Sequence, residues 1–485
     1  MSPIQVFNTL SGKKEEFATL EAGRVKIYAC GPTVYDLSHL GHARMAIVWD
    51  VVQRYLRFSG YDVTYVRNIT DVDDKIINRS RELGVKPEQV ARHYTFEFWK
   101  DMYALNVAPP DVEPRATEFI QPMIHFVEEL VGRGIAYVSA GDVYFDVASF
   151  KGYGKLSKKN LEDLNVGARE QVRSQEELKD LKRNPSDFAL WKGAREGEAG
   201  WESPWGLGRP GWHLECSVMI KSVLGETIDI HAGGEDLVFP HHENEIAQSE
   251  SLNGRPLANY WLHNSFVNVN QEKMAKSLGN FKTIGDLLAE YSADTLRLFL
   301  LQTHYRNPID FTKEGIDAAR QVTQRLVRAA SYADSFGEEK SQFFPAEKYA
   351  FTAQRAKELG DRREIAQFAR EFGQAMDNDF NTAVALSQLF ALADKIYQSK
   401  DEEERKDLAR ALKFYAGVLG LTLTDKRQEL DSRTSSKIMN LVLELRQAAR
   451  SKKDYATSDL IRNELAKAGI NVMDTTGGGA TWERS

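Results

Sequence analysis

The sequence predicts an α/β protein whose first half forms a doubly wound parallel sheet and whose later part is all helical. Two observations carry this prediction. Val25, Ile27 and Ala29 alternate with polar or amphipathic neighbours, as in a strand, and the break at Gly31 precedes a helical periodicity. By contrast, residues 345–425 repeat apolar side chains at helical spacing with few turn signals, which is typical of a helix bundle.

Length and composition bound the class of protein. A chain of 485 residues is too long for one core and long enough for about three or four domains. The chain is 42% hydrophobic and 27% charged, and it has no apolar run long enough to span a membrane and no apolar signal core near its start. Two cysteines argue against a disulfide framework, so we expect a cytoplasmic protein. A net charge of -7 does not suggest a nucleic-acid binder, although a local basic stripe can still contact phosphates.

The first half of the predicted sheet occupies residues 1–114. A helix from Ala43 to Phe58 is closed by Gly60, and a second strand follows at residues 62–68. Ligands of open α/β sheets bind at the carboxyl ends of such strands. Three aspartates lie just beyond the second strand, and they suit the cap of a helix better than a metal site: Asp71, Asp73 and Asp74.

Residues 115–205 are predicted to be an insertion into the sheet. Residues 136–147 have the pattern of a β-hairpin, and residues 187–192 together with the glycine- and tryptophan-rich residues 200–211 are expected to lead back to the main sheet. No catalytic constellation is visible in the insertion. The second half of the sheet then spans residues 206–270.

In that second half, strands are expected at residues 227–231 and 261–268. Residues 271–340 form a mainly helical region that begins with a lysine-rich loop, and residues 341–430 form the helical bundle. The small C-terminal domain, residues 431–485, opens with a helix that has six basic residues and one acid: Arg433, Lys437, Arg446, Arg450, Lys452 and Lys453, against Glu444.

Two stretches of the sequence contain side chains that could bind an anion. They are residues 30–44, Cys-Gly-Pro-Thr-Val-Tyr-Asp-Leu-Ser-His-Leu-Gly-His-Ala-Arg, and residues 273–277, Lys-Met-Ala-Lys-Ser. Together they resemble the two signatures of class I aminoacyl-tRNA synthetases, and the flanking residues resemble the cysteinyl-tRNA synthetase family. That family has isoleucine where Leu40 stands and serine where Ala275 stands, while the imidazoles, the glycine and the lysines are kept. The resemblance covers nearly the whole chain and implies a Rossmann-type catalytic domain.

Four scattered residues form a candidate zinc site. Pro240 stands where a helix would begin, which puts His241 and Glu245 on one helical face, and Cys30 and Cys216 supply two thiolates. Two thiolates, an imidazole and a carboxylate suit zinc, and the resemblance places the family's zinc ligands at these four positions. Zinc prefers a thiolate strongly, so we expect one ion per chain that selects cysteine over serine, with a purely structural zinc as the alternative.

The resemblance implies a reaction in two steps. L-Cysteine is activated with ATP and Mg²⁺, and the cysteinyl group then passes to the 3′ end of tRNA(Cys). The implied catalytic residues are His39, His42, Lys273 and Lys276. The implied nucleotide site is Thr33, His39, His42, Gly233, Gly234, Asp236 and Lys276. The implied amino-acid pocket is Cys30, Gly31, Thr33, Thr70 and Trp212.

The resemblance also assigns roles to the remaining regions. Residues 115–205 would be a connective module at the acceptor end of the tRNA, residues 271–340 would include a stem contact, and the basic C-terminal domain would recognise the anticodon end. A monomer is expected on the same ground.

Three other functions agree less well with the sequence. The cysteine ligase of mycothiol synthesis resembles the catalytic half, but residues 433–485 match the synthetase. A metal-dependent hydrolase would leave the lysine loop unexplained. A non-catalytic tRNA-binding paralogue would be expected to lack His39, His42 or Lys276, and all three are present.

Overall fold

The computed structural model consists of two compact units, Met1–Leu423 and Thr424–Ser485. The described residues are 3–159, 181–195, 198, 200–270, 272–273, 282–333, 362–424, 439, 442–451, 454–467, 470–474 and 480–484.

A parallel sheet of four strands forms the centre of the first unit. Its order is β10 (Ala258–Asn264), β9 (Ile228–Gly234), β3 (Arg24–Ala29) and β4 (Asp62–Arg67). The strand order reverses between β3 and β9, which lie on either side of the insertion in the sequence. This reversal is the point where open α/β sheets bind their ligands, and the doubly wound parallel sheet predicted from the sequence is confirmed.

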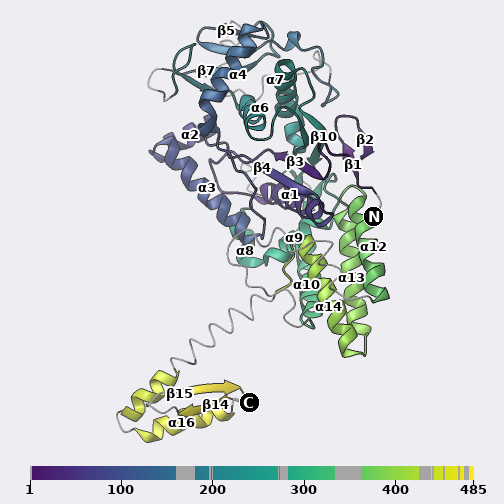
Figure 1. Cartoon of the computed structure of the whole chain (residues 1–485). Helices are drawn as coiled ribbons and strands as arrows, with labels where there is room; N and C mark the ends of the chain where they lie inside the picture. Colours follow the sequence, from purple (N-terminus) through teal and green to yellow (C-terminus); the bar gives the residue numbers. More distant parts are fainter. Residues whose placement is uncertain are drawn as a thin grey trace. The chain divides into compact units, whose positions relative to one another are not determined.

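Helices cover both faces of this sheet because β3 is apolar on both sides. Its residues 25, 27 and 29 pack into the core shared with α1 (Leu40–Phe58), whereas Tyr28 and Cys30 pack into a second core that contains Cys216. Figure 1 shows α1 on one face, and α6 (Trp212–Val223) and α7 (Glu243–Asn253) on the other. Cys30 therefore leaves the sheet on the side of α6 and α7.

The capping role expected of the aspartates is found at α2 (Asp74–Leu83), which precedes α3 (Pro87–Ala104). The carboxylate of Asp73 caps α2 by accepting the Lys75 backbone N–H at 2.8 Å. Asp71 instead accepts two hydrogen bonds from Thr117. These contacts satisfy the aspartates without a metal.

The insertion forms its own antiparallel sheet beside α4 (Ile120–Gly132). The strand order is β5 (Ala136–Ser139), β6 (Asp142–Phe145), β7 (Phe188–Gly193) and β8 (Gly208–Pro210), so the predicted hairpin is confirmed. Residues 187–192 and 208–210 pair within this sheet, and the chain then returns to the main sheet through α6 and β9, as expected. The buried Asp187 carboxylate accepts the Tyr137 hydroxyl and the Val147 N–H, and these bonds tie β7 to the hairpin.

The region from β9 onward differs from expectation in three ways. The strand predicted at 227–231 continues as β9 to Gly234, and the strand predicted at 261–268 is split into β10 and β11 (Val267–Val269). Region 271–340 is not wholly helical, because β13 (Ile309–Phe311) pairs in parallel with β11. The helices and the short strand of this region are α8 (Ile284–Glu290), α9 (Ala293–Leu301), α10 (Lys313–Ala330) and β12 (Glu272–Lys273).

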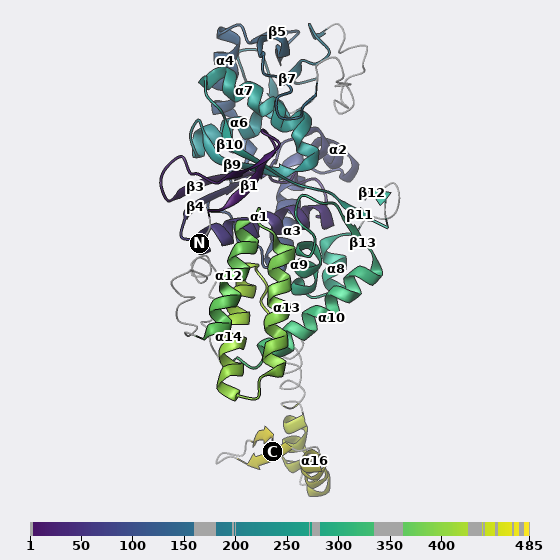
Figure 2. The same cartoon turned by 90° about the vertical axis from the view of Figure 1, so that its right-hand side faces the viewer.

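Within residues 362–424, three further helices belong to the predicted bundle, which packs on α10 (Figure 2). They are α12 (Arg363–Asp377), α13 (Thr382–Gln398) and α14 (Glu402–Val418). The predicted break at residues 376–382 is present, since Asp379 and Phe380 have φ values of 64° and 50°.

Asp379 in that break joins three parts of the chain. Its carboxylate accepts the Phe7 N–H at 2.9 Å, the Tyr305 hydroxyl at 2.8 Å and the Arg306 Nε–H at 2.8 Å. Phe7 belongs to β1 (Gln5–Asn8), the first strand of an N-terminal hairpin with β2 (Lys13–Glu16). The bundle is therefore bonded to the N-terminal hairpin and to the loop after α9.

A second buried contact joins the sheet's helix α1 to α9. Arg297 donates to the Asp50 carboxylate at 2.6 Å, and both side chains are fully buried. The same guanidinium donates to the Leu419 carbonyl at 2.9 Å, at the end of the bundle. Arg54 also pairs with Asp50 at 3.0 Å.

The second unit contains α16 (Tyr455–Lys467) and an antiparallel pair, β14 (Ile470–Asp474) and β15 (Ala480–Arg484). In the expected basic helix, Arg450 is exposed but Arg446 is 4% exposed, so Arg446 does not belong to a solvated stripe. The other four predicted basic residues, Arg433, Lys437, Lys452 and Lys453, lie outside the described residues. Among the described helices none is both long and apolar enough to cross a membrane.

Candidate active site and metal centre

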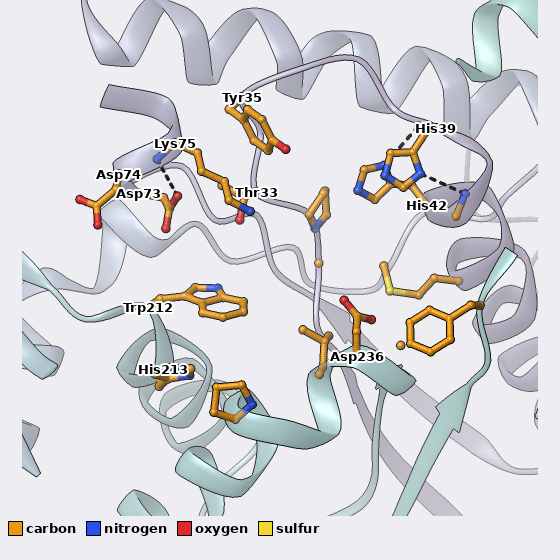
Figure 3. Close-up of a pocket in the computed structure, with 18 of the residues that line it drawn as sticks. Thr33, Tyr35, His39, His42, Asp73, Asp74, Lys75, Trp212, His213 and Asp236 are labelled. Carbon is orange, nitrogen blue, oxygen red and sulfur yellow. Dashed lines mark hydrogen bonds between the residues drawn. The ribbon is translucent and has the colours of Figure 1, made fainter. Parts of the chain in front are cut away.

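A cavity of about 600 Å³ opens at the carboxyl ends of β3 and β9, where the strand order reverses. Figure 3 shows His39 and His42 on one side of it, Lys75 and Tyr35 on another, and Trp212 below them. Of the predicted site residues, those that line the cavity are Gly31, Thr33, His39, His42, Trp212, Gly234 and Asp236.

Two stacked imidazoles lie at the start of α1. The His39 Nδ1 accepts the Gly41 N–H at 3.1 Å, and the His42 Nδ1 accepts the His39 N–H at 3.2 Å. In each neutral ring the proton is therefore on Nε2. Burial lowers the pKa of His39 to about 4, and burial next to His39 and Lys75 lowers the pKa of His42 well below its usual value. Both rings are neutral hydrogen-bond donors at neutral pH.

Buried neutral histidines make stability depend on pH. Burial lowers the pKa of His263 to about 3. In the unfolded chain the histidine has a pKa of about 6.5, so at a pH between that value and the lowered folded pKa only the unfolded chain binds the proton. The free energy of unfolding therefore decreases as the pH falls through this range, by up to about 1.4 kcal/mol per pH unit. Urea unfolding at pH 7 and pH 5 should show a smaller loss for His263→Gln than for the unchanged chain.

The matched control is His125→Gln, because His125 is exposed on α4. It should keep the full loss of stability between the two pH values. An unchanged loss in His263→Gln would contradict the assignment.

The four predicted metal ligands converge behind the cavity. Cys30, Cys216, His241 and Glu245 are buried, and one donor atom from each lies within 4.8 Å of the others. The two sulfurs are 3.8 Å apart, close to the separation of about 3.8 Å that tetrahedral zinc imposes on thiolates with bonds of about 2.3 Å. The Glu245 Oε1 lies 3.7 Å from the Cys30 sulfur and 3.1 Å from the His241 Nε2. These donors fit a zinc ion.

The thiols differ in their readiness to ionise. Burial, together with the neighbouring Cys216, raises the pKa of Cys30. Burial also opposes ionisation of Cys216, but hydrogen bonds from Cys30 and His241 lower the pKa of Cys216 to about 6. The second ring nitrogen of His241 lies 3.0 Å from the His213 Nδ1, and Trp212 stacks on His241 at 4.4 Å. Such contacts fix the orientation of a ligating imidazole.

The backbone element that carries His241 differs from the predicted one. The helix was expected to begin at Pro240, but α7 begins at Glu243, and His241 lies in the preceding turn Val238–His242. The turn still directs its Nε2 at Glu245. Phe239 is extended at φ -138° and ψ 132°, as a residue before a helix usually is, and the turn continues directly into α7.

A second donor group shares two members with the first. It combines Cys30 and Glu245 with His231 and His242. The His231 Nε2 is 2.8 Å from the Glu245 Oε2, and His242 bridges the Cys30 sulfur at 3.3 Å and His263 at 2.8 Å. Because both groups need Cys30 and Glu245, they are alternative sets of donors around the same two side chains.

Three predicted site residues lie behind the cavity wall. Cys30 belongs to the metal group, and the buried Thr70 hydroxyl donates to the buried Glu215 at 2.8 Å. Gly233 lies inside β9, where an added Cβ would be 2.8 Å from the His242 ring. Gly31 is equally constrained, because a Cβ there would be 1.6 Å from the Asn68 carbonyl oxygen.

The lysine loop is only partly described. The backbone of Lys273 belongs to β12, which pairs with β11 next to the cavity-lining Val267. Lys276 lies outside the described residues.

Sequence reasoning missed several residues of the site. Lys75 and Tyr35 line the cavity, and His213 and His242 contact metal ligands. Adjacency to Trp212 and His241 was the available signal for the two histidines. Lys75 carried no signal beyond its place after the capping aspartates.

Three family models match successive parts of the chain. The family model for the class I (C) tRNA synthetase catalytic domain matches residues 16–321. The DALR domain model matches residues 371–424, and the cysteinyl-tRNA ligase anticodon-binding domain model matches residues 436–482.

Curated relatives match along their full length. A cysteine–tRNA ligase of Syntrophobacter fumaroxidans is 47% identical, with 98% of each chain covered, and one of Clostridioides difficile is 46% identical, with 99% of this chain and 100% of the relative covered. Among solved structures, an Agrobacterium radiobacter LeuRS–tRNA–LeuAMS complex has a TM-score of 0.59 at 12% identity, covering 84% of this chain and 85% of that one. A Mycobacterium tuberculosis methionyl-tRNA synthetase with methionyl-adenylate has a TM-score of 0.53 at 16% identity, covering 87% and 94%.

Proposed function

Because the chain belongs to the cysteine–tRNA ligase family of class I aminoacyl-tRNA synthetases, we propose that its cavity makes cysteinyl-adenylate from cysteine and ATP and passes cysteine to tRNA(Cys). In the first step a cysteine carboxylate oxygen bonds to the α-phosphorus, and pyrophosphate leaves. In the second a ribose oxygen of the tRNA bonds to the cysteinyl carbonyl carbon, AMP leaves, and the hydroxyl proton is released. The observation that carries this proposal is that the metal group adjoins the cavity: Cys30 precedes the lining residue Gly31, and the lining residue Trp212 stacks on His241.

Cys30, Cys216, His241 and Glu245 are proposed to hold one zinc ion. Their two sulfurs, one imidazole and one carboxylate form a donor set that zinc accepts, whereas purely structural sites are normally richer in cysteine. A zinc ion held by these residues would supply an affinity for a thiolate that is far greater than its affinity for an alcohol. Selection of cysteine over serine then needs no editing site.

The nucleotide is proposed to lie against α1 and the end of β9. Neutral His39 and His42 would donate Nε2–H to phosphate oxygens, and Asp236 would accept from a ribose hydroxyl. Because the imidazoles are neutral, positive charge for the phosphates must come from Mg²⁺ and from lysines, for which we propose Lys273 and Lys276. Thr33, Gly31 and Trp212 would border the cysteine, with Thr70 supporting them from behind.

The other parts of the chain are proposed to bind tRNA. Residues 115–205 would receive the acceptor end, residues 271–340 would contact the stem, and residues 431–485 would recognise the anticodon end, in agreement with the description of the matching family model. We also propose a monomer that acts in the cytoplasm, where cysteine, ATP and tRNA are present together.

The proposed thiol selection can be tested by ATP–pyrophosphate exchange with cysteine and with serine, on zinc-replete and chelated protein. Exchange should require cysteine and should be lost on chelation and recovered with zinc. Exchange with both amino acids would contradict selection by the metal. Absence of exchange in zinc-replete protein would contradict the proposed first step.

A further inference from the structure

The wall of the cavity opposite His39 and His42 is formed by different parts of the chain. Figure 3 shows Tyr35, Lys75, Asp73 and Asp74 together on that side. The remaining lining there includes Ala189 and Lys192 of β7, in the inserted module. None of the roles proposed above uses the charged groups of this wall.

Lys75 is distinctive within this wall. Its Nζ lies 5.3 Å from the centre of the Tyr35 ring, a cation–π contact. The Asp73 carboxylate is engaged by a backbone N–H, and Asp74 pairs with Lys192 at 2.9 Å and with Arg209. Within the described part of the chain, no carboxylate forms an ion pair with Lys75.

The cavity therefore holds one ammonium group, that of Lys75, with which no carboxylate of the described residues forms an ion pair; the Asp73 carboxylate acts on it only through space. Lys192, the other lysine of the lining, is neutralised by Asp74. Tyr35 packs its body against the main core, which leaves its ring to support the Lys75 ammonium rather than to stack on a ligand. A supported, unpaired ammonium in a cavity is suited to bind an anion from a substrate.

The anion that Lys75 binds can be inferred from the substrates of the proposed reaction. The triphosphate is assigned to the α1 side and the lysine loop, and the ribose hydroxyl that attacks the cysteinyl carbonyl must enter through the part of the cavity that the nucleotide does not fill. That part is bordered by α2 and the inserted module. An RNA end carries a phosphate next to its last ribose.

We propose that Lys75 binds the phosphate before the 3′-terminal nucleoside of the tRNA, and that Tyr35 positions the ammonium for this contact. The inference rests on the proposed function and adds a residue for the second step alone. Lys75 thereby places the terminal ribose without taking part in adenylate formation.

The two steps can be measured separately. Lys75→Gln should slow single-turnover transfer from preformed enzyme-bound cysteinyl-adenylate by about 10- to 100-fold, because a charge-assisted contact is lost. Its cysteine-dependent ATP–pyrophosphate exchange should stay within about twofold of the unchanged enzyme. Lys75→Arg should recover most of the transfer rate, and Tyr35→Leu should lose less than Lys75→Gln.

Lys100→Gln is the matched control, because Lys100 is an exposed lysine on α3 that pairs with Glu97. It should leave both steps unchanged. A tRNA shortened by the terminal adenosine and its 5′ phosphate should bind the unchanged enzyme and Lys75→Gln equally, while full-length tRNA should bind the variant more weakly.

Each contrary result has a distinct meaning. An equal fall of exchange and transfer in Lys75→Gln would assign Lys75 to cysteine or ATP and overturn the inference. Unchanged transfer, or equal weakening of both tRNAs, would overturn it as well. Failure of exchange in the unchanged enzyme would instead refute the proposed function.

Discussion

Glu245→Gln should lower zinc affinity by more than about 100-fold and reduce cysteine-dependent pyrophosphate exchange to a similar extent. Loss of an outer-shell partner already costs about 10- to 100-fold in metal affinity, and the substitution removes a directly facing charge. The Glu245 side chain is fully buried, 3.1 Å from the His241 Nε2 and 2.8 Å from the His231 Nε2. Titration with a zinc-selective chelator and the exchange assay measure the two effects.

Glu250→Gln provides the matched control on the same helix. It removes the same charge from α7, but Glu250 pairs with Lys155 on the surface side of the helix, away from the thiols. The control should keep one zinc ion per chain. If Glu245→Gln also kept its zinc and its exchange activity, the carboxylate would serve only to hold His231.

Asp50→Asn should lower the free energy of unfolding of the first unit by about 3–5 kcal/mol. The substitution leaves the fully buried Arg297 guanidinium without its carboxylate, and an uncompensated buried charge carries a cost of that size. Burial favours the neutral carboxyl, but Arg54 and Arg297 outweigh it and lower the pKa of Asp50. Urea unfolding followed by circular dichroism measures the loss.

Asp317→Asn supplies the comparison at an exposed ion pair. Asp317 pairs with Arg320 at 3.0 Å on the surface of α10, where both partners remain in solvent. Its loss should change stability by less than about 1 kcal/mol. Equal effects of the two substitutions would show that water reaches the Asp50 pair.

The sequence predicted those elements whose signals are local. The alternation along β3, the hairpin at residues 136–147 and the break at Asp379 each depend on a few neighbouring residues, and each is present. The four metal-facing residues could be named before the fold was known because of the family resemblance. Their convergence depends on β3, α6 and the turn before α7 meeting at one edge of the sheet.

Other features depend on contacts between distant segments. The pairing of β7 with the hairpin depends on the buried Asp187, and the second set of histidines around Cys30 depends on β9 and the turn before α7 meeting near Cys30. Arg446 is 4% exposed, although its sequence neighbours suggest a solvated helix face. The local pattern of apolar and polar residues does not report contacts between distant segments. For this reason Arg446 in the basic helix was expected to be more exposed than it is.

The Asp379 junction has a consequence for synthesis on the ribosome. Phe7 is translated 372 residues before its partner Asp379. At about 5–20 residues per second, the N-terminal hairpin must wait roughly 20–75 seconds before that contact can form. A nascent chain stalled before residue 379 should therefore present β1 to added protease, whereas a chain released after the bundle has emerged should protect it.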